Sequence, residues 1–101
     1  MNIPLNYRIW KYKLEITGLQ KIEMPKGSEV LSVDNQNGRL CLWAKGDINK
    51  PKEVRHFEIF GTGDLMPSLI NLKHTFIGTV QIPPFVWHVF EIQRDTNDSN
   101  N

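Results

Sequence analysis

Apolar and polar residues alternate along several short stretches of this chain, as they do in strands that bury one face. The first stretch runs from Arg8 to Ile16, and a weaker one follows from Gln20 to Met24 after Gly18. Pro25 and Gly27 end the second stretch, because proline has no amide hydrogen to donate to a neighbouring strand. We expect two strands here, the second at a sheet edge or in a hairpin.

The clearest local signal is a hairpin over Glu29 to Ala44. Asn37 and Gly38 separate its two alternating stretches, and these residue types accept the positive backbone angles of a type I′ turn. A two-residue turn fixes the register and places Leu31 opposite Ala44. One face is expected to hold Leu31, Val33, Leu40, Leu42 and Ala44, and the other Ser32, Asp34, Gln36, Arg39, Cys41 and Trp43.

The second half of the chain repeats the strand pattern. Pro83-Pro84 suits a stiff corner between two strands, and Asp64 is a suitable cap for one short helical turn. The expected elements are a loop over 45–52, a strand over 53–60, a turn over 61–64, at most a short helix within 65–73, and strands over 74–82 and 85–93.

About seven strands with at most one short helix predict an all-β fold, a small antiparallel barrel or a two-layer sandwich. Residues 1–93 form the expected single domain, and 94–101 a disordered polar tail. Because a small sheet must protect its edges, we also expect a homo-oligomer. The aromatic residues expected in the core are Trp10, Tyr12, Phe57, Phe85 and Phe90.

Length and charge narrow the class of protein. The chain has 101 residues with 12 Lys and Arg against 11 Asp and Glu, and its pI is near 7.9. This length fits one domain, and the net charge of +1 gives no strong field for duplex nucleic acid or a membrane surface. Its one cysteine, Cys41, has no partner for an internal disulfide, and no apolar run approaches the ~18 residues of a membrane span. We expect a cytoplasmic protein that binds neither membrane nor duplex.

Motifs for catalysis or metal binding are weak. Cys41 and the three histidines, His56, His74 and His88, have none of the short spacings typical of zinc ligands. The Gly61-Thr62-Gly63 segment lacks the Lys-Ser/Thr pair of a phosphate-binding P-loop, so it is also consistent with an ordinary turn. No catalytic residue, metal or cofactor is therefore expected.

A set of aromatic and basic residues is more informative. Tryptophan stacks on nucleobases and arginine holds phosphates, but the same residue types dominate protein interfaces. These aromatic and basic residues are therefore consistent with a nucleotide site and with a protein interface. The candidate ligand-binding residues are Arg39, Trp43, Arg55, His56, Gly61, Thr62, Gly63, Trp87 and His88.

Several separated motifs carry a resemblance to a known family. They include Ile9-Trp10-Lys11-Tyr12, Met24-Pro25-Lys26-Gly27, Gln36-Asn37-Gly38, Cys41-Leu42-Trp43-Ala44, Gly61-Thr62-Gly63 and Val86-Trp87-His88-Val89-Phe90-Glu91. With these motifs the chain resembles small bacteriophage and prophage proteins of unassigned function. The resemblance implies a phage accessory protein that acts in the cytoplasm of the bacterial host.

Three function classes follow. The leading hypothesis is non-enzymatic counter-defence, in which the protein sequesters a nucleotide immune signal such as a cyclic ADP-ribose isomer or a cyclic oligonucleotide. The alternative is a protein-binding role, as an inhibitor of a host defence enzyme or a minor phage structural or morphogenesis component. The third is a small hydrolase that uses Glu58 with His56 or His88 as acid and base.

The first two hypotheses make different structural predictions. Sequestration predicts that Arg39, Trp43, Arg55 and His88 converge on one concave site. Protein binding predicts a flat, exposed patch instead.

Overall fold

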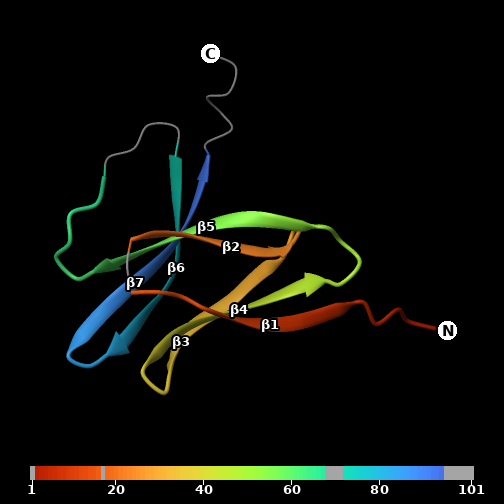
Figure 1. Cartoon of the computed structure of the whole chain (residues 1–101), viewed down its shortest axis with the longest axis horizontal. Helices are drawn as coiled ribbons and strands as arrows, with labels where there is room; N and C mark the ends of the chain where they lie inside the picture. The colour runs from red at the N-terminus through yellow and green to blue at the C-terminus, as the bar shows by residue number, and fades with distance from the viewer. Residues whose placement is uncertain (1, 17, 68–71, 95–101) are drawn as a thin grey trace, which may run out of the picture.

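The computed structural model describes residues 2–16, 18–67 and 72–94. Within these ranges the chain forms seven strands and no helix (Figure 1). The all-β prediction is therefore confirmed. The strands are β1 (Tyr7–Lys13), β2 (Leu19–Pro25), β3 (Glu29–Gln36), β4 (Arg39–Asp47), β5 (Lys52–Gly61), β6 (Leu72–Ile82) and β7 (Phe85–Arg94).

The strands form two separate antiparallel sheets, which makes the fold a sandwich and not a closed barrel. One sheet has three strands in the order β1-β4-β3, and the other has four in the order β2-β5-β7-β6. The sheets approach closely where β3 crosses β6, because a Cβ atom at Gly78 would lie 2.8 Å from Cγ2 of Val33. A glycine at this point lets the two layers pack.

The β3–β4 hairpin has the predicted turn and most of the predicted register. Asn37 and Gly38 have φ angles of 54° and 84°, and Ser32 lies opposite Trp43. The prediction for Leu31 is wrong, because a bulge between Val30 and Ser32 places Val30 opposite Ala44. Leu31 is exposed as a result. A bulge inserts an extra residue that alternation alone does not reveal.

The core lies between the two sheets. Phe57 is fully buried there as predicted, and Tyr12 packs against the core from β1. Phe85 and Phe90 are not core residues: Phe85 is 58% exposed, and the ring of Phe90 contacts Phe60, His74 and Phe76 on the outside of the sandwich. The buried core residues are Leu14, Met24, Leu40, Leu42, Ala44, Phe57, Ile59, Val80 and Val89.

The remaining predictions concern connections and ends. Pro83 and Pro84 join β6 to β7 through a cis peptide bond, at the predicted corner. Of the short helix predicted within 65–73, residues 65–67 have no regular structure, 72 and 73 begin β6, and 68–71 lie outside the described residues. Arg94 ends β7 instead of starting a tail, and 95–101 lie outside the described residues. A membrane-spanning helix is absent from the described residues.

Candidate functional site

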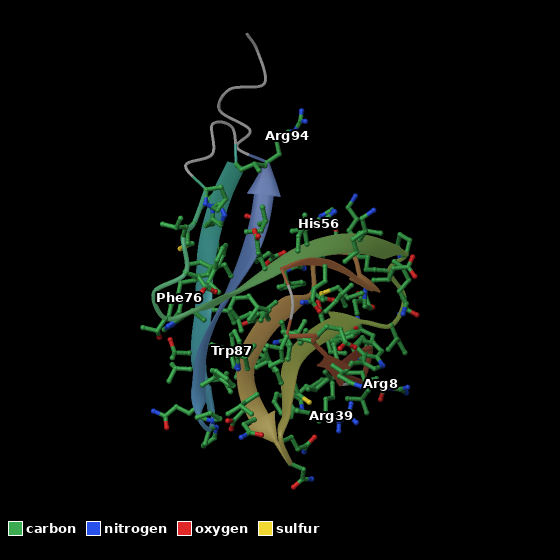
Figure 2. The ribbon with its side chains drawn as sticks, turned by 60° about the vertical axis from the view of Figure 1, so that its left-hand side comes forward. Arg8, Arg39, His56, Phe76, Trp87 and Arg94 are labelled. Carbon is green, nitrogen blue, oxygen red and sulfur yellow. The ribbon has the colours of Figure 1, made fainter. Side chains whose placement is uncertain are left out.

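The predicted ligand-binding residues lie on three different surfaces. Arg39 and Trp43 lie on the side of the three-stranded sheet that faces away from the core, where Trp43 is opposite Lys11 and Ser32. Figure 2 shows Arg39, His56 and Trp87 on separate parts of the molecule. The convergence that sequestration by Arg39, Trp43, Arg55 and His88 would require is absent from the structure.

Arg55 is part of the sandwich interior. Its Nε and Nη2 donate hydrogen bonds to the two carboxylate oxygens of Glu91 at 2.5 and 3.0 Å, and Nη1 donates to the backbone oxygen of Ser28 at 2.7 Å. The hydrogen bond to Glu91 raises the pKa of Arg55. Because these contacts occupy the guanidinium, Arg55 holds β5, β7 and the β2–β3 turn together and is not presented to a phosphate.

His56 and His88 lie on what we call the outer face, the side of the four-stranded sheet that points away from the three-stranded sheet. His56 and His74 both lie opposite Ile92 of the central strand β7, and His88 lies opposite Phe60 and Thr79. All three histidines of the chain therefore share this face. The register of β5 and β6 on β7 brings them together, and no spacing in the sequence shows it.

A cluster of aromatic rings occupies the centre of the outer face. The Phe90 ring lies 5.4 Å from Phe76, 5.8 Å from Phe60 and 6.2 Å from His74, measured between centroids. Phe60 is buried, whereas Phe76 is 57% exposed. Edge-to-face pairs of this kind stabilise a rigid apolar surface. The outer face therefore presents preformed aromatic area to solvent.

A shallow apolar hollow adjoins this cluster, toward the end of the sheet where β7 finishes. Its apolar walls come from Leu19, Leu72 and Ile92, and its volume is about 270 Å³. His56 and Arg94 also line it, and Figure 2 shows both toward this end of the sheet. We call it the Leu19 hollow. An apolar side chain next to a carboxylate would fit such a lining.

A larger hollow lies where β5 ends and β7 begins. It measures about 460 Å³, and we call it the Trp87 hollow. Three of the predicted ligand-binding residues, Gly61, Thr62 and Trp87, do line it together. The remaining lining residues, Asp64, Pro84, Phe85 and Val86, were not predicted for a site. The chain thus brings these three predicted residues together, and Arg55 and His56 together line a separate hollow of about 240 Å³.

The Gly61–Asp64 turn forms one wall of the Trp87 hollow. The amide of Gly61 donates to Oδ2 of Asp64 at 2.6 Å, and the amide of Asp64 donates to the Gly61 oxygen at 3.0 Å. The amide of Thr62 donates to the backbone oxygen of Val86 at 3.3 Å, which joins the turn to β7. Gly63 has a φ of 92° and is absent from the lining. The turn is therefore a fixed wall of the hollow.

His88 links the turn to the sheet. Its Nε2 forms a hydrogen bond with Oγ1 of Thr62 at 2.8 Å, and its Nδ1 forms one with Oγ1 of Thr79 at 2.9 Å. In a neutral ring one nitrogen donates and the other accepts, and a hydroxyl can take either role. Nucleophilic catalysis uses a similar hydroxyl and imidazole pair, with a carboxylate usually orienting the imidazole. Here the third group is the neutral hydroxyl of Thr79.

Phe85 and Asp64 are the functional candidates that sequence reasoning missed. The sequence predicts Phe85 in the core with other aromatic residues, but the residue follows the Pro83-Pro84 corner at the end of the sheet and is 58% exposed. For Asp64 the sequence indicates only a helix cap. Among the described residues, no group of three or more His, Cys, Asp or Glu is arranged to hold a metal ion.

Comparison with models of protein families identifies the family of the chain. A family model described as a domain of unknown function, DUF7352, matches residues 6–99. No curated protein and no solved structure matches the chain. The match therefore covers nearly the whole chain but assigns no activity to the hollows or the outer face.

Proposed function

The chain belongs to the DUF7352 family, a domain of unknown function, and we propose that it acts without catalysis as a protein-binding domain. Its binding surface is the outer face of the four-stranded sheet. The observation that supports this proposal is the exposed aromatic cluster, with Phe76 57% exposed and Leu19 60% exposed on the same face. Contiguous apolar area on a soluble domain is typical of an interaction surface, and aromatic residues are frequent binding hot spots.

The charges on this face indicate a partner other than a second copy of the chain. Glu58 lies within the row that runs Leu19, Glu58, Phe90 and Phe76 across the sheet. A two-fold axis through the middle of the face would bring the Glu58 carboxylates of two copies toward each other, and like charges in an interface are unfavourable. A different protein has no such constraint.

The two hollows describe the expected partner more closely. Arg94 and His56 line the Leu19 hollow, whereas Asp64 is the charged residue that lines the Trp87 hollow. From Trp87 to Arg94 along β7 is roughly 23 Å at the usual rise per residue. An extended segment of about eight residues, with an acidic group near the Leu19 hollow, would cover this distance. A few more residues would carry it around the end of the sheet to Trp87, whose side chain is on the inner side.

Nucleotide capture is the second candidate, supported by Gly61, Thr62 and Trp87 lining one hollow. A nucleobase would stack on the tryptophan. However, the charged group in that lining is the Asp64 carboxylate, which repels phosphates, and the guanidinium of Arg55 is already bound to Glu91. Protein binding is therefore the function that this geometry supports better.

The resemblance to small bacteriophage and prophage proteins suggests where the partner is found. We place the protein in the cytoplasm of a bacterial host, where it inhibits a host defence enzyme or serves as a minor component of phage assembly. Either role requires affinity and no turnover.

The test is selection of binding peptides from a random 12-residue display library, followed by affinity measurement on matched variants. Phe76→Ser removes the exposed ring of the outer face, and Ile9→Ser is the control, because Ile9 is 58% exposed on the other sheet. We expect the selected peptides to bind the wild type and Ile9→Ser equally and to lose at least about tenfold in affinity for Phe76→Ser.

Two results would overturn the proposal. The first is that no peptide is enriched, or that the enriched peptides bind Phe76→Ser as tightly as the wild type. The second is a dimer of the wild type, seen by light scattering, that Phe76→Ser dissociates and Ile9→Ser does not. That result would assign the outer face to self-association.

A further inference from the structure

We infer that the Trp87 hollow is a receptor for a guanidinium group, supplied by an arginine side chain of the partner. The receptor chemistry stands on the hollow alone, and the protein source of the guanidinium rests on the proposed function. The lining provides two aromatic rings and one carboxylate, which are the groups that bind a planar cation.

The aromatic part of the receptor is formed by Phe85 and Trp87. Their ring centroids are 5.7 Å apart with an interplanar angle of 39°, so the rings are tilted relative to each other. Phe85 is 58% exposed, and Trp87 is half-buried against the core. One ring is thus anchored and the other is open to a ligand. A guanidinium above either ring face is attracted by its negative electrostatic potential.

Gly61 brings the carboxylate and the anchored ring close together. A Cβ atom at Gly61 would lie 3.2 Å from Oδ2 of Asp64 and 3.3 Å from Cζ3 of Trp87. The carboxylate and the indole therefore flank a single point that a side chain would fill. The amide of Gly61 binds Oδ2 and holds the carboxylate in this position. A cation in the hollow would meet both groups at once.

Charge decides which ligand fits. None of the described Lys or Arg side chains lines the hollow, so its carboxylate has no cation from the lining, and a phosphate would meet only repulsion there. A cation–π contact of the same kind occurs within the chain on the three-stranded sheet, where Nζ of Lys45 lies 5.6 Å from the centroid of the Tyr7 ring. We favour guanidinium over ammonium because it stacks flat on a ring while its N–H groups reach a carboxylate.

The hollow lies around the end of the sheet from the proposed docking surface, because Trp87 alternates with His88 along β7 and its ring packs against the core on the inner side. Thr62 lines it and bonds to His88, which lies opposite Phe60 on the outer face. An extended segment that crosses the aromatic cluster would have to bend around the end of the sheet, past Thr62, to reach the hollow. The partner segment is then expected to carry an arginine at the Trp87 end and an acidic residue at the Arg94 end.

The test follows the three indole N–H signals of Trp10, Trp43 and Trp87 by NMR while acetyl-arginine amide is added. The neutral control probe is acetyl-citrulline amide, which has the same shape without the charge. We expect a saturable shift of the Trp87 signal with the arginine probe, a weaker one with acetyl-lysine amide, and none with the citrulline probe. An equal response to the citrulline probe would overturn the inference.

Three variants locate the receptor. Asp64→Asn removes the charge and keeps an oxygen for the Gly61 amide, and we expect affinity for the arginine probe to fall roughly fivefold. Asp34→Asn is the matched control, because Asp34 is also exposed and also accepts a hydrogen bond from a backbone amide, that of Asn35. Phe85→Leu keeps apolar volume and removes the ring, so it should weaken binding as well. Unchanged affinity in both Asp64→Asn and Phe85→Leu would exclude this site.

Further binding measurements distinguish a failure of this inference from a failure of the proposed function. Tighter binding of an arginine-containing peptide than of free agmatine would assign the guanidinium to a protein, and the reverse would assign it to a small molecule. If selected peptides depend on Phe76 but the arginine probe leaves Trp87 unshifted, the inference fails and the proposed function stands. If AMP shifts the Trp87 indole N–H signal and the arginine probe does not, the inference fails and nucleotide capture is favoured.

Discussion

Arg55 and Glu91 form a two-point ion pair across β5 and β7, with contacts of 2.5 and 3.0 Å. The side chains are 14% and 9% exposed. Both lie on the inner side of the four-stranded sheet, next to Phe57, which is directly opposite Glu91. Arg55 thus has a structural role, although its residue type alone is also consistent with a ligand site.

Because of this ion pair, we expect replacement of Arg55 to destabilise the fold far more than replacement of Arg39. Arg55→Ala leaves the Glu91 carboxylate buried and unpaired, which is expected to lower the free energy of unfolding by roughly 3 kcal/mol. Arg39→Ala should change it by no more than about 0.5 kcal/mol, because Arg39 is exposed. Urea unfolding of both variants measures this.

The double variant Arg55→Met, Glu91→Leu provides the control for that prediction. Removing both charges leaves no unpaired group, so it should be more stable than Arg55→Ala. If the Arg55→Ala and Arg39→Ala variants unfold at the same urea concentration, the ion pair does not stabilise the fold.

Gly78→Ala tests the contact between the two sheets. The new methyl group would lie 2.8 Å from Cγ2 of Val33, so the layers must move apart, at a cost of about 1–3 kcal/mol. Gly18→Ala is the control, since nothing lies within 4 Å of its Cβ position. Adding Val33→Ala to Gly78→Ala should recover part of the midpoint lost in thermal unfolding. Equal effects of the two glycine variants would contradict the packing described for β3 and β6.

We expect the Asp47 carboxylate to stabilise the fold by an amount that depends on pH. The backbone amide of Asn49 donates to its Oδ1 at 2.8 Å, and this bond, with one from the Asn6 side chain, lowers the pKa of Asp47. A lowered pKa in the folded state gives stability that is present above the ordinary carboxyl pKa of about 3.9 and is lost as pH falls through the folded value.

The measurement compares urea unfolding of the wild type and Asp47→Asn at pH 6 and near pH 2. The wild type should be the more stable protein at pH 6, and the difference should shrink at the acidic value. A difference that stays constant, or grows in acid, would show that the Asp47 carboxylate is not stabilised by these contacts.

His88→Ala should loosen the wall of the Trp87 hollow. It removes the hydrogen bonds to Thr62 and Thr79, each worth about 1 kcal/mol when its partner remains. Hydrogen exchange at the Thr62 amide, which bonds to Val86, is expected to speed up by roughly fivefold. The Gly38 amide, bonded to Asn35 in the distant β3–β4 turn, is the internal control. Unchanged exchange at Thr62 would mean that the turn is held without His88.

For Arg55, the alternation of residues in the sequence is a better guide to its role than its residue type. The pattern over 53–60 placed Arg55 on the same side as Phe57 and Ile59, which is the core side in the structure. A charged residue on a core face implies a buried partner, but Glu91 is 36 residues away and no local signal identifies it. The partner, and hence the structural role of Arg55, required the β5–β7 register.

The strands, the Asn37-Gly38 turn and the core side of β4 and β5 could be predicted from the sequence, whereas the inward residues of β3 and β7 could not all be predicted. These features depend on a two-residue period and on local turn chemistry, which act over a few residues. Which strands pair, and therefore which side chains meet, depends on how the two sheets pack. Pairing of β5 and β6 with β7 gathers three histidines and three phenylalanines on one face, and it sets Trp87 beside Gly61. Such contacts join residues far apart in the chain, because the core is buried only when whole sheets stack.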